Sequence, residues 1–79
     1  MNKRVYDAIK NGRADNNINF SDFQNLIIDL GFIYKRQDGS HKIYRHKIYN
    51  AIMIIQADGN KAKGYQVRQL KKLIEMYNL

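Results

Sequence analysis

An Asp38-Gly39 pair between two strand-like segments is the feature that most constrains the fold of this chain. The segments at 32–37 and 41–46 carry aromatic and isoleucine side chains, and an Asp-Gly pair between such segments favours a two-residue hairpin turn. A third run, at 51–56, is rich in isoleucine and predicts a further strand. We therefore expect a three-stranded antiparallel meander with the Asp-Gly turn between its first two strands.

Two amphipathic helices are predicted on either side of these strands. Ser21 and Gln24 form a capping box at the start of the first helix, and apolar residues follow at 23–30 with the spacing i, i+3, i+4, i+7. Gly31 suits the left-handed position after that helix. A similar apolar stripe at 67–77 predicts the second helix.

A short helix at 2–11 is predicted ahead of these elements, with a polar segment at 11–19 after it and a polar loop at 57–64. A helix, a meander and a helix in that order are typical of the double-stranded-RNA-binding fold. We therefore predict an α+β protein of double-stranded-RNA-binding-like fold, α-β-β-β-α with an additional short N-terminal helix. Its three-stranded antiparallel sheet carries both main helices on one face.

Length and composition bound the class of protein. Seventy-nine residues with 44% hydrophobic content fit one small domain, 1–79. The chain has no cysteine, so disulfides and thiolate zinc sites are excluded and a reducing cytoplasm is the natural compartment. The longest apolar run, 51–55, is far shorter than the roughly 20 residues of a membrane-spanning helix. No apolar signal segment follows the basic N-terminus. We expect a cytoplasmic protein that does not bind a membrane.

The net charge of +7 is concentrated in the second half of the chain. Up to Tyr34 the basic and acidic residues balance, whereas from Lys35 to Lys72 ten basic residues accompany only Asp38 and Asp58. This asymmetry favours a nucleic-acid partner, because each cation placed on a phosphate releases a counterion. The alternative is a solvated surface that keeps a small protein soluble.

His41 follows the predicted turn and is the candidate catalytic residue. With Asp38 and Gly39 in the turn, Arg36 pairs with His41 across the hairpin and the two side chains share a face. A neutral imidazole there can take a proton from a ribose 2′-hydroxyl while the guanidinium stabilises charge on the phosphate. The alternative is a polar strand residue without chemistry. His46 points to the other face and is not expected to act as a partner.

The remaining site residues are predicted to bind RNA. They are the polar side chains of the hairpin and of the loop before the last helix: Lys35, Arg36, Ser40, Lys42, Arg45, Lys61 and Lys63. We expect no metal site, because the seven acidic residues are scattered without ligand spacing. No glycine-rich nucleotide loop is present, so no small-molecule cofactor is expected either.

A series of short motifs covers nearly everything after Asn19. They are Leu30-Gly31-Phe32, Arg36-Gln37, Gly39-Ser40-His41 with Tyr44 and Arg45, Ile54-Ile55-Gln56-Ala57-Asp58-Gly59, Lys61-Ala62-Lys63 and Tyr65-Gln66-Val67-Arg68-Gln69. Together they resemble the HicA family of toxin mRNA interferases. The resemblance implies a double-stranded-RNA-binding-like fold, His41 as the catalytic residue and a HicB antitoxin that masks the site. It divides the chain into an N-terminal helical extension, 1–19, and a HicA-like core, 20–79.

The sequence therefore predicts a metal-independent endoribonuclease toxin of a type II toxin–antitoxin system, acting in the stress response and binding mRNA through its basic surface. The alternative is a non-catalytic RNA-binding module of the same fold. A third possibility is a protein-interaction domain whose charge recruits an acidic partner. Both faces of the strand at 51–55 are apolar, so either another protein or the N-terminal helix covers one of them.

Overall fold

The computed structural model describes residues 1–13 and 17–79, so residues 14–16 of the polar segment predicted at 11–19 lie outside it. In chain order its elements are α1 (Lys3–Lys10), α2 (Phe20–Asp29), β1 (Phe32–Asp38), β2 (His41–His46), β3 (Ile52–Ile55), β4 (Ala57–Asp58), β5 (Lys61–Ala62) and α3 (Gly64–Tyr77). The first three strands form one antiparallel sheet in the order β1-β2-β3, and β4 pairs with β5 as a small separate hairpin. The predicted α+β class and the order of helix, meander and helix are confirmed.

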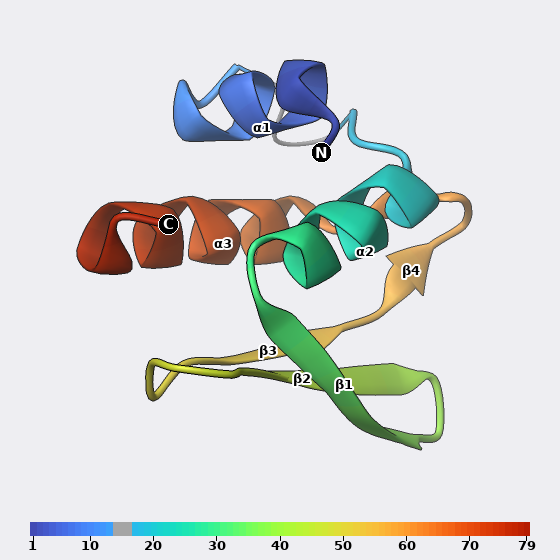
Figure 1. Ribbon diagram of the computed structural model, residues 1–79. Coiled ribbons are helices and arrows are strands. Elements are labelled where there is room, and N and C mark those ends of the chain that lie inside the picture. Colours follow the sequence, from blue (N-terminus) through green and yellow to red (C-terminus); the bar gives the residue numbers. More distant parts are fainter. Residues whose placement is uncertain (14–16) are drawn as a thin grey trace.

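The elements are stacked in three layers, as Figure 1 shows. Helix α2 packs against β1 and α3 against β3, so both cover the same face of the sheet. This is the double-stranded-RNA-binding-like arrangement that the sequence predicted. Helix α1 lies on the other side of α2 and α3, away from the sheet. No described element covers the second face of the sheet, which we call the outer face.

Strand β3 shows how the two faces of the sheet differ. Met53 and Ile55 point toward the helices and are fully buried, whereas Ile52 and Ile54 each expose 47% of their surface. The N-terminal helix does not cover them, because α1 packs on α3 and α2 instead. Of the two alternatives for this strand, cover by the N-terminal helix is therefore ruled out.

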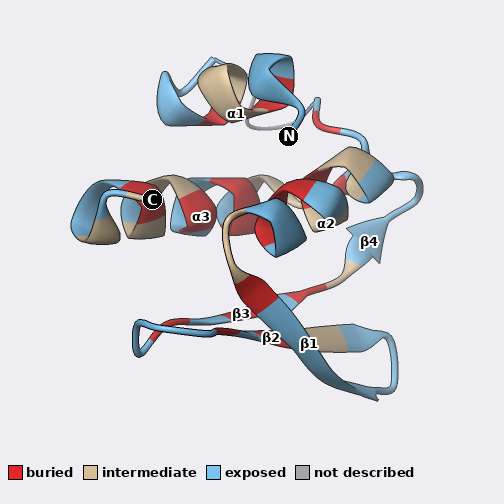
Figure 2. Ribbon diagram, in the orientation of Figure 1, coloured by how far each residue is buried: buried red, intermediate tan, exposed pale blue. Residues whose placement is uncertain are grey.

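The hydrophobic core lies between the sheet and the helices and continues to α1, as the burial colours in Figure 2 show. Its larger side chains come from all three layers: Val5, Ile9, Phe23, Leu26, Ile27, Phe32, Tyr44, Met53, Ile55, Val67, Leu70 and Ile74. The apolar stripes predicted at 23–30 and 67–77 supply the helix side of this core. Removing these side chains from water provides the main driving force for the fold.

Helix α2 begins at a different cap from the one predicted. Asn19 is the N-cap, and its Oδ1 accepts a hydrogen bond from the N–H of Asp22 at 3.2 Å. The predicted Ser21–Gln24 capping box was therefore wrong. Asparagine is among the strongest N-caps, and its bridge to β5 holds the backbone extended just before the helix. At the other end Gly31 has a φ of +102°, which confirms the predicted left-handed position.

The segment at 57–64 is more ordered than the predicted polar loop. Strands β4 and β5 pair Asp58 with Lys61 around a turn that contains Gly59. The N–H of Ala62 donates to the carbonyl of Ile18 at 2.9 Å, which ties this small hairpin to the chain before α2. Two-residue strands are too short to show an alternating pattern, which is why they were not predicted.

The β1–β2 hairpin turns one residue later than predicted. Gly39 and Ser40 occupy the turn, and Asp38 pairs with His41. Gly39 has a φ of +60° and Ser40 has no positive φ, which is the pattern of a type II′ turn with glycine first. The predicted Asp38-Gly39 turn was therefore wrong: an Asp-Gly pair favours a type I′ turn, in which Asp38 would also have a positive φ, and Asp38 instead ends β1 with no positive φ.

A β-bulge at Lys35 sets which side chains of β1 face outward. Tyr34 pairs with Tyr44, the next pair is Arg36 with Ile43, and Lys35 falls opposite no residue. Tyr34 lies on the helix side with Phe32, because side chains alternate along a strand, and the extra residue turns Arg36 to the outer face.

Candidate active site

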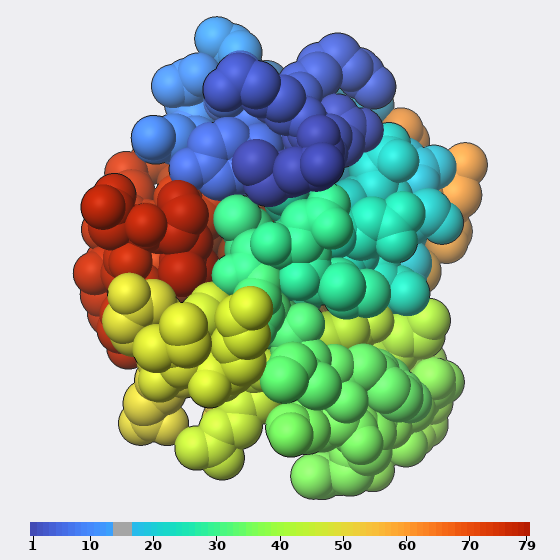
Figure 3. Space-filling model, in the orientation of Figure 1, coloured from blue at the N-terminus to red at the C-terminus, as the bar shows by residue number. Residues whose placement is uncertain are grey.

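His41 begins β2 at the tip of the hairpin, and its side chain is exposed. Strand alternation places the imidazole on the outer face, and in the space-filling view of Figure 3 the green hairpin forms a lower corner of the molecule. The partner of His41 on β1 is Asp38. On the other side β2 pairs Lys42 with Ile55, so one further step brings Gln56 level with His41.

Arg36 shares the outer face with His41, but the two are not paired as predicted. Arg36 lies opposite Ile43, and its Nε donates to the Asp38 carboxylate at 3.2 Å. Asp38 therefore occupies the place across from His41 that was predicted for Arg36, because the turn is one residue later and the bulge adds a residue. The two side chains of this ion pair are 67% and 62% exposed, so it adds little stability and leaves the guanidinium accessible to an anion.

Hydrogen bonds tie the tip of the hairpin to the start of α3. Gln56 donates from Nε2 to the Ser40 Oγ at 2.5 Å, and Lys63 donates from Nζ to the Gln56 Oε1 at 2.8 Å. The backbone N–H of Gln56 donates to Oε1 of Gln66, a fully buried side chain, at 3.3 Å. These bonds hold the turn that precedes His41 and bring the Lys63 ammonium close to it.

We call this group the tip site. Its members are His41, Arg36, Asp38, Ser40, Gln56 and Lys63. Two further predicted cations are exposed on the hairpin but outside the tip site. Arg45 is on the outer face four residues along β2 from His41, about 13 Å away at the usual rise of a strand, and Lys35 is at the bulge. Of the predicted site residues, the structure therefore brings His41, Arg36, Ser40 and Lys63 together at the tip of the hairpin.

Two of the predicted RNA-binding residues are not part of the tip site. Lys42 points to the helix side of the sheet, where its Nζ donates to Oε1 of Gln24 at 3.1 Å. Lys61 belongs to the small hairpin, and its Nζ donates to Oδ1 of Asn17 at 2.9 Å. Neither ammonium shares the outer face with the imidazole.

His46, at the end of β2, has a structural role. It exposes only 5% of its surface, and Nε2 lies 2.8 Å from the carbonyl oxygen of Leu30. Nδ1 accepts from the N–H groups of Ile48 and Tyr49 at 3.1 and 3.2 Å. Because Nδ1 accepts, the ring proton is on Nε2, which donates to the Leu30 carbonyl. As strand alternation predicted, His46 lies on the opposite face from His41.

Sequence reasoning missed Asp38 and Gln56 as neighbours of His41. A signal for Asp38 was present, because Gly39-Ser40 is also a recognised two-residue hairpin loop and places Asp38 opposite His41. The position of Gln56 follows from strand pairing, since the end of one antiparallel strand lies level with the start of the next.

The fold and the tip site define a class of protein: small α+β proteins of double-stranded-RNA-binding-like architecture with an exposed histidine at a basic hairpin tip. A family model described as the HicA toxin of bacterial toxin-antitoxin matches residues 20–76, from the start of α2 to the last turn of α3. The chain therefore belongs to the HicA toxin family, as its motifs predicted. No curated protein and no solved structure matched it.

Family membership gives the chain a toxin role in a toxin–antitoxin system, and it implies an antitoxin as partner. Helix α1 precedes the matched residues. Within residues 1–13 and 17–79, none of the helices has the length and apolar character needed to span a membrane.

Proposed function

We propose that this chain is a metal-independent endoribonuclease, an mRNA interferase toxin of a type II toxin–antitoxin system, with His41 as its catalytic residue. The observation that carries the proposal is the exposed imidazole at the hairpin tip, which makes no hydrogen bond to any described residue. Arg36 lies on the same face. Imidazole is the side chain most often used to transfer protons in enzymes, and a guanidinium suits a phosphate.

The reaction needs only the RNA and one proton-transfer group. The imidazole of His41 takes the proton of a ribose 2′-hydroxyl, and the 2′-oxygen attacks the adjacent phosphorus. The bond from phosphorus to the 5′-oxygen then breaks, and that oxygen takes up a proton from the imidazolium or from water. The products are a 2′,3′-cyclic phosphate and a 5′-hydroxyl. Arg36 stabilises the charge that develops on the phosphate oxygens.

Cations around the tip support RNA as the substrate. Arg36 lies on the outer face with His41, and Lys63 is held near the turn through Gln56. Arg45 is on the same face further along β2, and Lys35 is exposed at the bulge, so an RNA strand that extends from the tip along the hairpin would meet both. Phosphate contacts of this kind give binding that is independent of sequence and weakens with salt. The tip site therefore combines a reactive group with the means to hold a phosphodiester next to it.

The proposal is tested by incubating RNA with the protein in EDTA and comparing wild type with His41→Ala. General acid–base catalysis contributes about 10²- to 10⁴-fold, so we expect His41→Ala to lower the cleavage rate at least about 100-fold while RNA binding persists. Lys72→Ala removes one exposed cation from α3 and serves as the control, with an unchanged cleavage rate. RNA bound by wild type without cleavage would support the non-catalytic binding module instead. Absence of RNA binding would support the protein-interaction domain.

We also propose that the implied antitoxin is HicB-like and binds the outer face of the sheet. Ile52 and Ile54 are half-exposed there, and Arg36 and Arg45 lie on the same face. An apolar patch beside cations fits a partner that presents apolar side chains flanked by carboxylates. Such a partner also covers His41, which lies on that face.

A further inference from the structure

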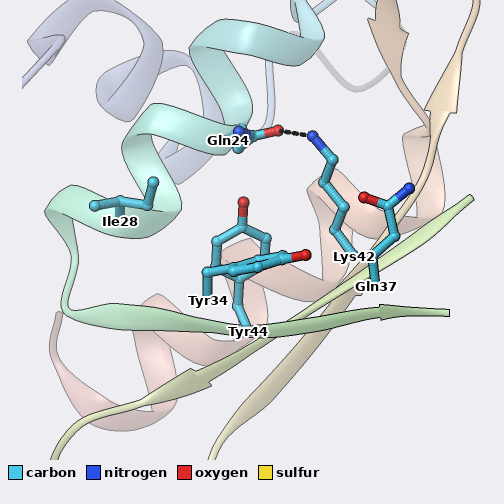
Figure 4. A pocket seen from close by; sticks show the side chains of 6 residues that line it. All are labelled: Gln24, Ile28, Tyr34, Gln37, Lys42 and Tyr44. Carbon is cyan, nitrogen blue, oxygen red and sulfur yellow. Dashed lines mark hydrogen bonds between the residues drawn. The ribbon is translucent and has the colours of Figure 1, made fainter.

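A shallow pocket lies on the helix side of the hairpin, opposite the face that carries His41 (Figure 4). It encloses about 300 Å³, at the lower end of the range of small-ligand sites. Its walls come from α2, β1 and β2, and the residues that line it are Gln24, Ile28, Tyr34, Gln37, Lys42 and Tyr44. None of the six is acidic, and one is a cation, so the pocket favours a neutral or anionic ligand.

Tyr34 gives the pocket an accessible aromatic ring. Half of its surface is exposed, and its ring meets the buried Tyr44 ring edge-on, with the centroids 5.5 Å apart and the planes at 66°. Figure 4 shows both rings between the strands and α2. Burial, with the Tyr34 phenol close by, raises the pKa of Tyr44 above its usual value, so its hydroxyl stays protonated. Tyr44 thus supports Tyr34 as a platform on which a flat ligand can stack.

Two glutamines present unused hydrogen-bonding groups in the pocket. The Oε1 of Gln24 accepts from Lys42 at 3.1 Å, and its Nε2 has no partner among the described residues. The Nε2 of Gln37 donates to the carbonyl of Gly39 at 2.9 Å, and its Oε1 has no partner in that same set of residues. The helix wall therefore offers a donor and the strand wall an acceptor, with the Lys42 ammonium between them.

We propose that this pocket binds an unpaired base of the RNA, with the base stacked on Tyr34 and its edge hydrogen-bonded by Gln24 and Gln37. The inference rests on the proposed function, because it takes RNA as the substrate. A nucleobase is flat and carries donors and acceptors side by side along its edge. In a duplex that edge is occupied by pairing, so proteins read it in single strands by stacking and edge contacts.

The pocket lies close enough to His41 to act on the same RNA strand. Gln37 pairs with Lys42, and the next pair toward the turn is Asp38 with His41. The two pairs are one step of about 3.3 Å apart along the strands and point to opposite faces. A single strand that passes around the hairpin tip brings a phosphodiester to His41 and a neighbouring base to the pocket. The pocket then selects the nucleotide next to the cleaved bond.

The test uses a short single-stranded RNA with one 2-aminopurine, a base whose fluorescence changes when its stacking changes. The protein carries His41→Ala so that the RNA stays intact. We expect Tyr34→Ala in this background to abolish the fluorescence change and to weaken binding about 5- to 150-fold, which corresponds to about 1–3 kcal/mol for one stacked base. Tyr34→Phe keeps the ring and should keep both signals. Ile48→Ala truncates another exposed apolar side chain, beyond the far end of β2, and is the control.

The outcomes separate the pocket from the proposed function. If Tyr34→Ala binds and changes the fluorescence as Ile48→Ala does, the base-binding pocket is wrong, and a partner-protein side chain becomes the better candidate occupant. Cleavage by wild type in EDTA is measured separately. If RNA cleavage depends on His41 and Tyr34→Ala changes neither binding nor fluorescence, only the base-binding pocket is refuted. A Tyr34-dependent fluorescence change without any cleavage supports the pocket in a non-catalytic RNA-binding protein.

Discussion

The two histidines of this chain have different roles because their surroundings differ. The His41 imidazole is exposed at the start of β2 and makes no hydrogen bond to the described residues. His46, at the other end of the same strand, is buried, hydrogen-bonded at both ring nitrogens and packed edge-on against Phe32 at 5.0 Å. Strand β2 thus places a candidate catalytic side chain on the outer face and a structural side chain on the helix side of the sheet.

Gly31 is the residue whose replacement tests the packing around His46. A Cβ at Gly31 would lie 2.8 Å from Nε2 of His46, and the φ of +102° strains any residue with a side chain. We expect Gly31→Ala to lower the free energy of unfolding by about 1–3 kcal/mol from the backbone alone, and further through the clash with the ring. Gly59→Ala is the matched control, with a φ of +63° and nothing within 4 Å of the added Cβ. Urea unfolding measures both, and equal losses would contradict the role of His46.

At the scale of elements, the helices and strands with long hydrophobic patterns were predicted from the sequence. The apolar stripes at 23–30 and 67–77 identified α2 and α3, and the runs on either side of the turn identified β1 and β2. The pairing register of β1 with β2 was not predicted correctly. Asp38-Gly39 and Gly39-Ser40 overlap and both fit a two-residue loop, so the turn residues alone do not distinguish the two registers.

Only part of the tip site was predicted, because its members depend on the register of the hairpin. His41 was identified from its place after the turn, which both registers preserve. Its neighbours depend on the exact pairing, so Asp38 was missed. The bulge at Lys35 was missed as well, and it decides which face Arg36 and the residues after it occupy.

Gln56 tests whether the tip must be held in place for the reaction. Gln56→Ala removes the bonds to Ser40 and Lys63. We expect kcat for RNA cleavage to fall about 10- to 100-fold with little change in KM, because small displacements of a reacting group are costly. Unfolding should change by less than about 0.5 kcal/mol, as is usual for surface substitutions. Gln69→Ala, an exposed glutamine of α3, is the control. Unchanged kcat in Gln56→Ala would show that these bonds do not position the tip.

At the scale of the whole molecule, α1 adds a third layer far from the hairpin (Figure 1). The hydroxyl of Tyr6 donates to the carbonyl of Leu79 at 2.8 Å, which ties this helix to the C-terminal end of the chain. Since α1 packs on the helices, it stabilises the side of the molecule opposite the sheet and leaves the outer face open to a partner.

Substitutions on the outer face of the sheet should weaken antitoxin binding. The double variant Ile52→Ser, Ile54→Ser removes the exposed apolar side chains of β3 without touching the core. We expect it to remain toxic and to escape a co-expressed HicB-like antitoxin, since each large apolar side chain buried at an interface contributes about 1.5–3 kcal/mol. Growth of cells that express both proteins measures this, and Met76→Ser, exposed on α3, is the control. Full neutralisation of the double variant would place the antitoxin elsewhere.

If the His41 imidazole takes the proton of a 2′-hydroxyl, cleavage requires that hydroxyl at the cleaved position. This is measured with one oligonucleotide in EDTA, with and without a single 2′-deoxy nucleotide at that position. Wild type should cut the all-RNA strand to a 2′,3′-cyclic phosphate and a 5′-hydroxyl. It should bind the substituted strand without cutting it, and His41→Ala should cut neither. Equal cleavage of the two strands by wild type, or cleavage by His41→Ala at the wild-type rate, would contradict the account.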